Sequence, residues 1–129
     1  MSHDDCHCDS GLPFQQCCYP YLEGETEAPT PVALMRSRYC AFVTGNLDYL
    51  IYTWHPDDCP RDLSLDGKQK WIGLKVLDHG EYEPGKSGWV HFVARYKIAG
   101  QAHRLEERSL FSHIHGRWYY RHPDTQKED

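Results

Sequence analysis

Four of the six cysteines of this 129-residue chain lie close together near its start, in the stretch CHCDSGLPFQQCC. They are Cys6, Cys8, Cys17 and Cys18. Two close pairs of thiols separated by a turn can converge on one ion, and zinc accepts four thiolates in a closed tetrahedral site. So short a segment has too small a core to fold alone, and metal binding would contribute the missing free energy. The spacing therefore predicts a structural zinc knuckle with these four ligands.

Other uses of these sulfurs are less consistent with the sequence. The first residues, MSHDDCHC, lack the basic start and apolar middle of a signal peptide, and no apolar run is long enough to cross a membrane. We therefore expect a cytoplasmic protein, in which thiols stay reduced and a disulfide framework is disfavoured. A redox pair normally shows the C-x-x-C spacing, which is absent here. An iron–sulfur site remains open on ligand number alone.

The charge of the chain is unevenly distributed. The formal net charge is -5, and residues 1–30 carry several Asp and Glu but no Lys or Arg. Four thiolates around a divalent ion would make this segment still more negative. Binding to a phosphate backbone depends on Lys and Arg, so nucleic-acid binding by the first segment is disfavoured.

Two helices are expected after an acidic, proline-bearing stretch. Thr30 is suited to the N-cap and Pro31 to the first position of a helix that Gly45 ends. Its apolar residues recur at helical spacing, and Cys40 is expected to be a small core residue. A second helix is predicted over 46–54, with these residues buried: Leu47, Leu50, Ile51 and Trp54.

From Trp71 the apolar period changes to that of strands, and the sequence predicts a four-stranded antiparallel meander. A turn at Gly100-Gln101 would pair Ile98 with His103, and a turn at His115-Gly116 would pair Ile114 with Arg117. In this register one face collects Val90, Phe92, Ala94, Tyr96, Leu105, Glu107, Ser109, Phe111, Trp118 and Tyr120. The opposite face collects His91, Arg95, Lys97, Arg108, Arg117 and Arg121, and is expected to be a solvated basic band.

Glu107 is the polar exception on the inner face, where the predicted register places it opposite Ala94. A buried carboxylate is costly unless it is paired or hydrogen-bonded. One interpretation is an ion pair with Arg36 or Arg38 of the first helix. A second is a small-molecule site whose polar groups come from Tyr39, Glu107, Ser109 and Trp118. An error in the register, which would leave Glu107 exposed, is the third.

The pattern C-x-C-x-S-G-x3-Q-x-C-C resembles the SEC-C motif, a small zinc knuckle. Together with ALMRSRYCAFVTGNLDYLIYTWHP, HFVARY and RLEERSLFSHIHGRWYY, the chain resembles the YchJ family of bacterial proteins from about residue 4 to 122. The resemblance implies an α+β fold similar to nuclear transport factor 2, in which helices pack on one face of a curved antiparallel sheet to form a cone. With the acidic, proline-bearing stretch as a linker, we expect a knuckle over 1–22, a linker over 23–30, the cone-shaped domain over 31–123 and a disordered tail over 124–129.

Three functions are compatible with these features. The leading hypothesis is a zinc-binding adaptor or binding protein whose knuckle contacts a protein partner and whose cone is a scaffold or a small-ligand pocket. A small enzyme that uses Glu107 as a general acid or base is the first alternative, and it rests on fold analogy alone. An RNA- or ribosome-associated protein is the second. No H-E-x-x-H, phosphate loop or nucleophile elbow occurs in the sequence.

Overall fold

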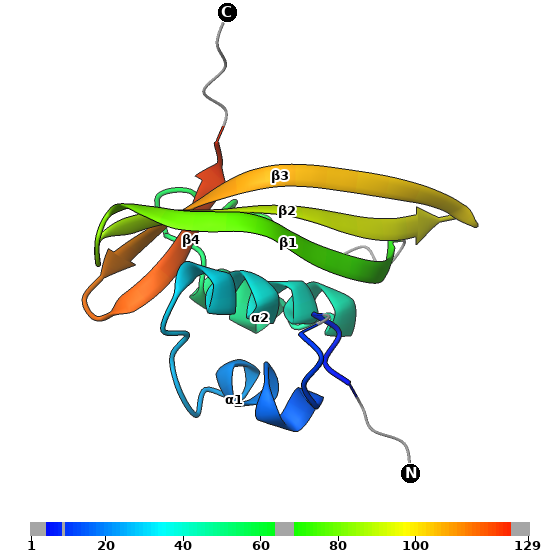
Figure 1. Cartoon of the computed structure of the whole chain (residues 1–129), viewed down its shortest axis with the longest axis horizontal. Coiled ribbons are helices and arrows are strands. Elements are labelled where there is room, and N and C mark those ends of the chain that lie inside the picture. Colours follow the sequence, from blue (N-terminus) through cyan, green and yellow to red (C-terminus); the bar gives the residue numbers. More distant parts are fainter. Residues whose placement is uncertain (1–4, 9, 64–68, 125–129) are drawn as a thin grey trace, which may run out of the picture.

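The structure of the protein is a computed structural model, and it describes residues 5–8, 10–63 and 69–124. Its elements are η1 (Phe14–Gln16), α1 (Tyr19–Leu22), α2 (Pro31–Thr44), α3 (Leu47–Tyr52), β1 (Lys70–Glu83), β2 (Ser87–Ile98), β3 (Gln101–Ile114) and β4 (Arg117–Pro123). The strands form one antiparallel sheet in the order β1-β2-β3-β4, and α2 lies against one face of it (Figure 1). The predicted α+β architecture is thus confirmed. No helix in the described ranges is long and apolar enough to span a bilayer.

Helix α2 begins and ends where the sequence predicts. The Thr30 hydroxyl accepts a hydrogen bond from the Ala33 amide at 3.1 Å, and Pro31 occupies the first turn. Gly45 has a φ of 76°, a left-handed conformation that glycine adopts without strain. Local side-chain chemistry therefore sets both ends of the helix that carries most of the site.

Helix α3 is shorter than expected. It ends at Tyr52, and Asn46 caps its start by accepting a hydrogen bond from the Tyr49 amide at 3.0 Å. Tyr49 and Leu50 are buried against Ala41, whereas Ile51 is 46% exposed. The predicted burial of Ile51 is wrong, because a helix of so few residues presents only one narrow side to its neighbour.

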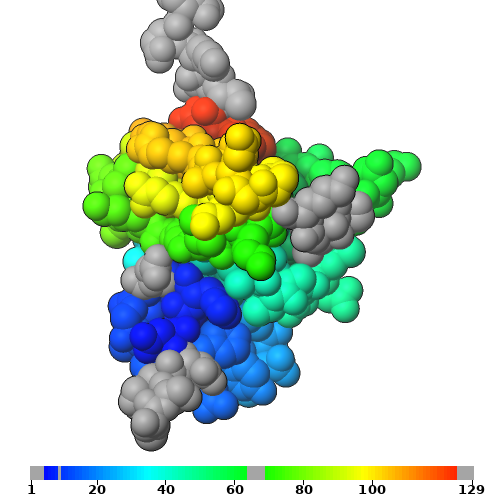
Figure 2. Space-filling view, turned by 90° about the vertical axis from the view of Figure 1, so that its right-hand side faces the viewer, coloured from blue at the N-terminus to red at the C-terminus, as the bar shows by residue number. Residues whose placement is uncertain are grey.

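Helix α2 is buried on more than the one side that its apolar period indicates. Figures 1 and 2 show it as the middle layer, with the sheet on one side and the N-terminal knuckle on the other. Cys6, Cys8 and Cys18 belong to the same hydrophobic core as Leu34 and Phe92. The knuckle and the cone therefore share a core, and the stability of one depends on the other.

The segment expected to be a linker is fastened to the cone. Ala28 is buried, the Glu27 carboxylate accepts a hydrogen bond from the Tyr52 hydroxyl at 2.7 Å, and the Pro29 carbonyl accepts one from the Trp118 indole at 3.2 Å. At the other end, Asp124 pairs with Arg108 at 3.5 Å, and the rest of the expected tail lies outside the described residues.

The turn between β2 and β3 differs from the prediction by one residue. Ala99 and Gly100 form it, with φ values of 53° and 82°, and Ile98 pairs with Gln101 instead of His103. A type I′ hairpin turn requires a positive φ at both central residues. The match between this turn and the twist of the strands outweighs the cost of a positive φ at alanine. The error moves each partner by two positions, so the faces of the sheet are unchanged. Glu107 consequently stands opposite Phe92 and not Ala94.

The turn between β3 and β4 is as predicted. Ile114 pairs with Arg117, and His115 and Gly116 have φ values of 52° and 83°. The two hairpins thus use the same kind of turn, and only in the second does the sequence place it unambiguously.

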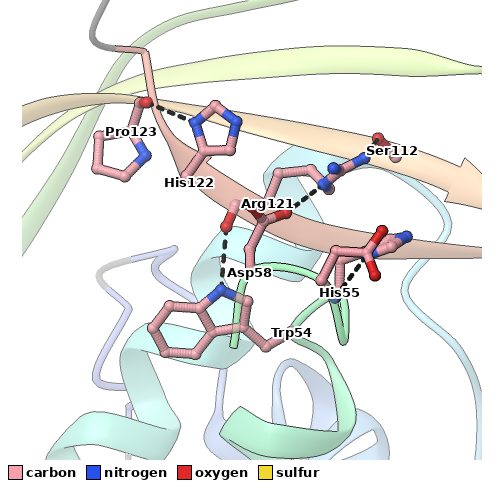
Figure 3. A network of polar contacts seen from close by, with 8 residues as sticks. Trp54, His55, Asp58, Ser112, Arg121, His122 and Pro123 are labelled. Carbon is pink, nitrogen blue, oxygen red and sulfur yellow. Dashed lines mark hydrogen bonds and ion pairs between the residues drawn. The ribbon is translucent and has the colours of Figure 1, made fainter. Parts of the chain in front are cut away.

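The outer face of the sheet is less basic than its sequence indicates. Glu106 contacts both His91 and Arg104, at 2.6 and 3.1 Å. Arg121 pairs with Asp58 and donates a further hydrogen bond to Ser112 at 3.3 Å, as Figure 3 shows. These contacts offset much of the positive charge that an RNA backbone would need.

The contact between α2 and α3 predicts a loss of stability at alkaline pH. The Tyr49 hydroxyl lies 2.6 Å from the Ser37 hydroxyl, and burial raises the pKa of Tyr49 to about 12. A raised pKa means that the folded state holds the proton more tightly. The stabilisation is therefore complete below pH ~10 and is lost as the pH rises towards 12, at up to about 1.4 kcal/mol per unit.

Urea denaturation at several pH values measures this effect. Above pH ~10 the free energy of unfolding should fall less steeply for Tyr49→Phe than for the wild type. Tyr82→Phe is the matched control, because Tyr82 is 52% exposed. Equal slopes for the wild type and Tyr49→Phe would contradict the prediction.

Candidate metal centre and cavity

The four predicted metal ligands lie together in the structure. The Sγ atoms of Cys6, Cys8, Cys17 and Cys18 are all within 4.8 Å of one another. The Sγ of Cys17 is 3.6 Å from that of Cys8 and 3.9 Å from that of Cys18. Four sulfurs at about 2.3 Å from a tetrahedral zinc would be separated by roughly 3.8 Å. The arrangement is therefore suited to one shared ion.

Two tight turns bring the thiol pairs together. The Cys6 amide donates to the Leu12 carbonyl at 2.9 Å, and Gly11 between them has a φ of 87°. The second pair follows η1, and Cys18 is the residue directly before α1. Ser10 is an additional group that the sequence reasoning missed, since its hydroxyl lies 3.1 Å from the Sγ of Cys17. A hydroxyl in this position can donate to a bound thiolate.

Two residues of α2 join this cluster from the cone. The Sγ of Cys40, with no exposed surface, is 3.4 Å from the Sγ of Cys6, and Arg36 Nη1 donates to the Cys8 carbonyl at 2.6 Å. Cys40 is a core residue, as expected, but its contact with the cluster was not predicted. The contact joins positions 34 residues apart in the sequence, and no local spacing pattern indicates it.

We expect Cys40 to tune the metal site as a donor to the Cys6 thiolate. Cys40→Ser keeps a donor, whereas Cys40→Val removes it, and losing such a partner typically weakens metal affinity by about 10–100-fold. Zinc affinity, measured by competition with a chromogenic chelator, should fall in the valine variant and largely hold in the serine variant. Cys59→Ser is the control, because Cys59 lies outside the cluster. Equal affinities for all three variants would contradict this role.

A cavity of about 200 Å³ lies between α2 and the inner face of the sheet. It is lined by Met35, Arg38, Tyr39, Phe42, Trp54, Gln69, Trp71, Phe92, Ala94, Leu105, Glu107, Ser109 and Tyr120. Three of the four predicted pocket residues, Tyr39, Glu107 and Ser109, are among them. Trp118 is not: its indole donates to Pro29 and its ring packs on His113, with the ring centres 4.9 Å apart.

The ion pair expected between Glu107 and Arg36 or Arg38 is wrong. Glu107 forms no ion pair within 4.0 Å among the described residues. Its Oε2 accepts hydrogen bonds from Ser109 at 2.6 Å and from Tyr120 at 3.3 Å. Burial, and next the Glu107 charge, raise the pKa of Tyr120, which therefore remains a donor. Neutral hydroxyls, and not a guanidinium, satisfy this oxygen.

Arg38 is the functional candidate that the sequence reasoning placed wrongly. It is 4% exposed, and its Nη1 donates to the Leu50 carbonyl at 2.9 Å and to the Thr53 hydroxyl at 2.8 Å. Its Cζ lies 5.0 Å from the ring centre of Trp54 and 4.5 Å from that of Tyr120. Burial lowers the pKa of Arg38 to about 10, so it stays charged at neutral pH. Arginines are seldom fully buried, and helical spacing alone did not reveal this one.

The aromatic wall of the cavity is held from the sheet. Trp54 donates its indole N–H to the Arg121 carbonyl at 3.0 Å, as Figure 3 shows, and its ring meets Tyr120 edge-on. Tyr39 and Phe42 contact Trp71 on the other side. Rings fixed by hydrogen bonds and by one another give the cavity a defined shape.

Comparison with known proteins agrees with this fold and with the cysteine cluster. Residues 30–123 match the family described as YchJ, middle NTF2-like domain. A SEC-C motif containing protein from Rhodopseudomonas palustris, solved in solution, is 34% identical, with a TM-score of 0.83 over 95% of this chain and 98% of that one. A SEC-C motif containing protein from Psychrobacter arcticus is 25% identical, with a TM-score of 0.78 over 100% of this chain and 85% of that one. The chain therefore belongs to the YchJ family, with a cysteine cluster that fits a SEC-C knuckle ahead of its NTF2-like domain.

Proposed function

We propose that this chain is a cytoplasmic zinc-stabilised binding protein whose cone takes up a small molecule. The observation that carries the proposal is Arg38, a buried charged side chain that lines a largely apolar cavity and forms no ion pair with a carboxylate among the described residues. A buried charge is costly and contributes little to stability unless something pairs with it. A ligand is the natural partner.

Zinc is the ion that the donor set favours. Four thiolates at tetrahedral spacing suit zinc, and a site closed by four protein ligands leaves no position for a substrate. Such an ion would stabilise the fold and carry out no reaction. The free state of all six cysteines agrees with a reducing compartment.

Binding is favoured over catalysis by what the cavity contains. It has one carboxylate, Glu107, and hydroxyls of Tyr39, Ser109 and Tyr120. Among the described lining residues there is no histidine, cysteine or lysine that could act as a base or nucleophile beside them. The arrangement can hold and orient a molecule by charge and hydrogen bonds.

The knuckle is also proposed to contact a protein partner. Leu12 supports this role, because it is 49% exposed at the turn between the two thiol pairs. Affinity capture with the intact chain and with Leu12→Asp tests it, since the substitution changes an exposed side chain and none of the four clustered cysteines. Partners that bind both forms equally would argue against a contact through this turn.

Ligand-observed NMR with a small fragment library tests the binding function. Ala94→Leu fills the cavity, because Ala94 is 1% exposed and lines it, whereas Ala102→Leu changes an exposed position on the neighbouring strand. Fragments should bind the wild type and Ala102→Leu and lose binding in Ala94→Leu. A library without a single fragment sensitive to Ala94→Leu would contradict the proposal.

A further inference from the structure

The Glu107 carboxylate offers one unused oxygen to the cavity. Both of its hydrogen bonds, from Ser109 and Tyr120, go to Oε2. Oε1 has no hydrogen-bond partner among the described residues. It is not one of the fully buried polar atoms, so it remains accessible. A carboxylate oxygen accepts strong hydrogen bonds from ammonium groups. Oε1 is therefore an accessible acceptor at the sheet side of the cavity.

The Arg38 guanidinium offers unused donors from the helix side. Both hydrogen bonds to Leu50 and Thr53 are made by Nη1. Nε and Nη2 have no hydrogen-bond partner among the described residues, and neither is a fully enclosed atom. Arg38 as a whole is only 4% exposed, and it is one of the residues that line the cavity. A planar guanidinium with unused N–H groups on two adjacent nitrogens is suited to a carboxylate.

The two charges are near each other but do not pair. Their nitrogen and oxygen atoms are not within 4.0 Å, and the Tyr120 ring, with its hydroxyl on Glu107 and its face near Arg38, contacts both groups. A ligand with a single negative charge at Arg38 would be repelled by Glu107. A ligand with a single positive charge at Glu107 would be repelled by Arg38, because Coulomb interactions are strong where water is excluded.

We propose that the cavity binds a small zwitterion with an apolar body, of the class of α-amino acids with apolar side chains. This inference rests on the proposed binding function. The ligand carboxylate would bind Arg38 at Nε and Nη2, its ammonium would donate to Glu107 Oε1, and its side chain would lie among the aromatic rings. The volume of about 200 Å³ is below that of pockets for drug-sized ligands and suits a molecule of this size.

Titration with three matched molecules tests the ligand class. Metal-replete, full-length protein labelled with ¹⁵N is titrated with L-leucine, with 4-methylpentanoate, which lacks the ammonium, and with 3-methylbutylamine, which lacks the carboxylate. Leucine should bind at least about tenfold more tightly than either, with amide shifts centred on the cavity strands and α2. Tighter or equal binding of one singly charged molecule would overturn the zwitterion while leaving the binding function intact. If none of the three molecules shifts these amides, the zwitterion proposal is also overturned. The fragment library then tests the binding function separately.

Two variants and a control assign the ammonium site. Glu107→Gln should weaken leucine binding by about tenfold, because it removes only the negative charge. The affinity for 4-methylpentanoate should stay unchanged or rise. Ser109→Ala should also weaken leucine binding, because it removes the 2.6 Å hydrogen bond that holds the Glu107 carboxylate in position. Glu106→Gln is the control, since Glu106 lies on the outer face and pairs with His91 and Arg104. Leucine affinity that falls equally in Glu106→Gln, or in none of the variants, would contradict the assignment.

Discussion

The double variant Cys8→Ser, Cys18→Ser is expected to lose about 4 kcal/mol of stability, which for a chain of this size lowers the melting temperature by roughly 15 °C. Two thiolates are lost, and the remaining sulfurs cannot close a tetrahedral site. Because Cys8 and Cys18 are buried in the same core as Leu34, the loss extends to the cone. Thermal and urea denaturation in zinc-containing buffer measure it.

The control for this variant is Cys59→Ser, which removes a thiol outside the cluster and should leave the melting temperature close to that of the wild type. A chelator of high affinity should lower the melting temperature of the wild type to that of the double variant. It should change the melting temperature of the double variant little. A double variant as stable as the wild type would show that the knuckle is an independent appendage.

Phe111→Ala is expected to lose about 3–5 kcal/mol, the second large effect. Phe111 is 1% exposed and its ring meets Tyr120 edge-on, with the ring centres 5.7 Å apart. Removing it leaves a void behind the tyrosine that holds Glu107, so both the sheet core and the cavity wall are weakened. The free energy of unfolding from urea titration is the measurement.

Leu77→Ala is the matched control, because Leu77 lies in β1 and is 43% exposed. Leu77→Ala should lower the free energy of unfolding by no more than about 0.5 kcal/mol, the usual range for surface positions. Similar losses in the two variants would contradict the placement of the core.

What could be predicted from the sequence is what depends on neighbours in the chain. The start of α2 follows from Thr30 and Pro31, the last hairpin from His115-Gly116, and the convergence of the four cysteines from two thiol pairs on either side of a turn. The faces of the sheet could also be predicted, because an error of two positions in the register keeps every side chain on its side.

What could not be predicted depends on packing between distant segments. Helix α2 lies between two layers, so its apolar period shows only the sheet side, and neither the burial of Arg38 nor the contact of Cys40 with Cys6 follows from spacing. The partner of Glu107 was predicted wrongly for a related reason. Opposite charges nearby suggest an ion pair, but the Tyr120 hydroxyl reaches the carboxylate and its ring covers the guanidinium.

Metal content is the most direct test of the central claim, that four thiolates of the knuckle hold a structural zinc ion. Elemental analysis of metal-replete protein should give about one zinc per chain for the wild type and much less for Cys17→Ser, Cys18→Ser. Less than about half an equivalent in the wild type, with well-dispersed NMR signals from residues 6–18, would contradict the account, because the knuckle would then be ordered without the ion.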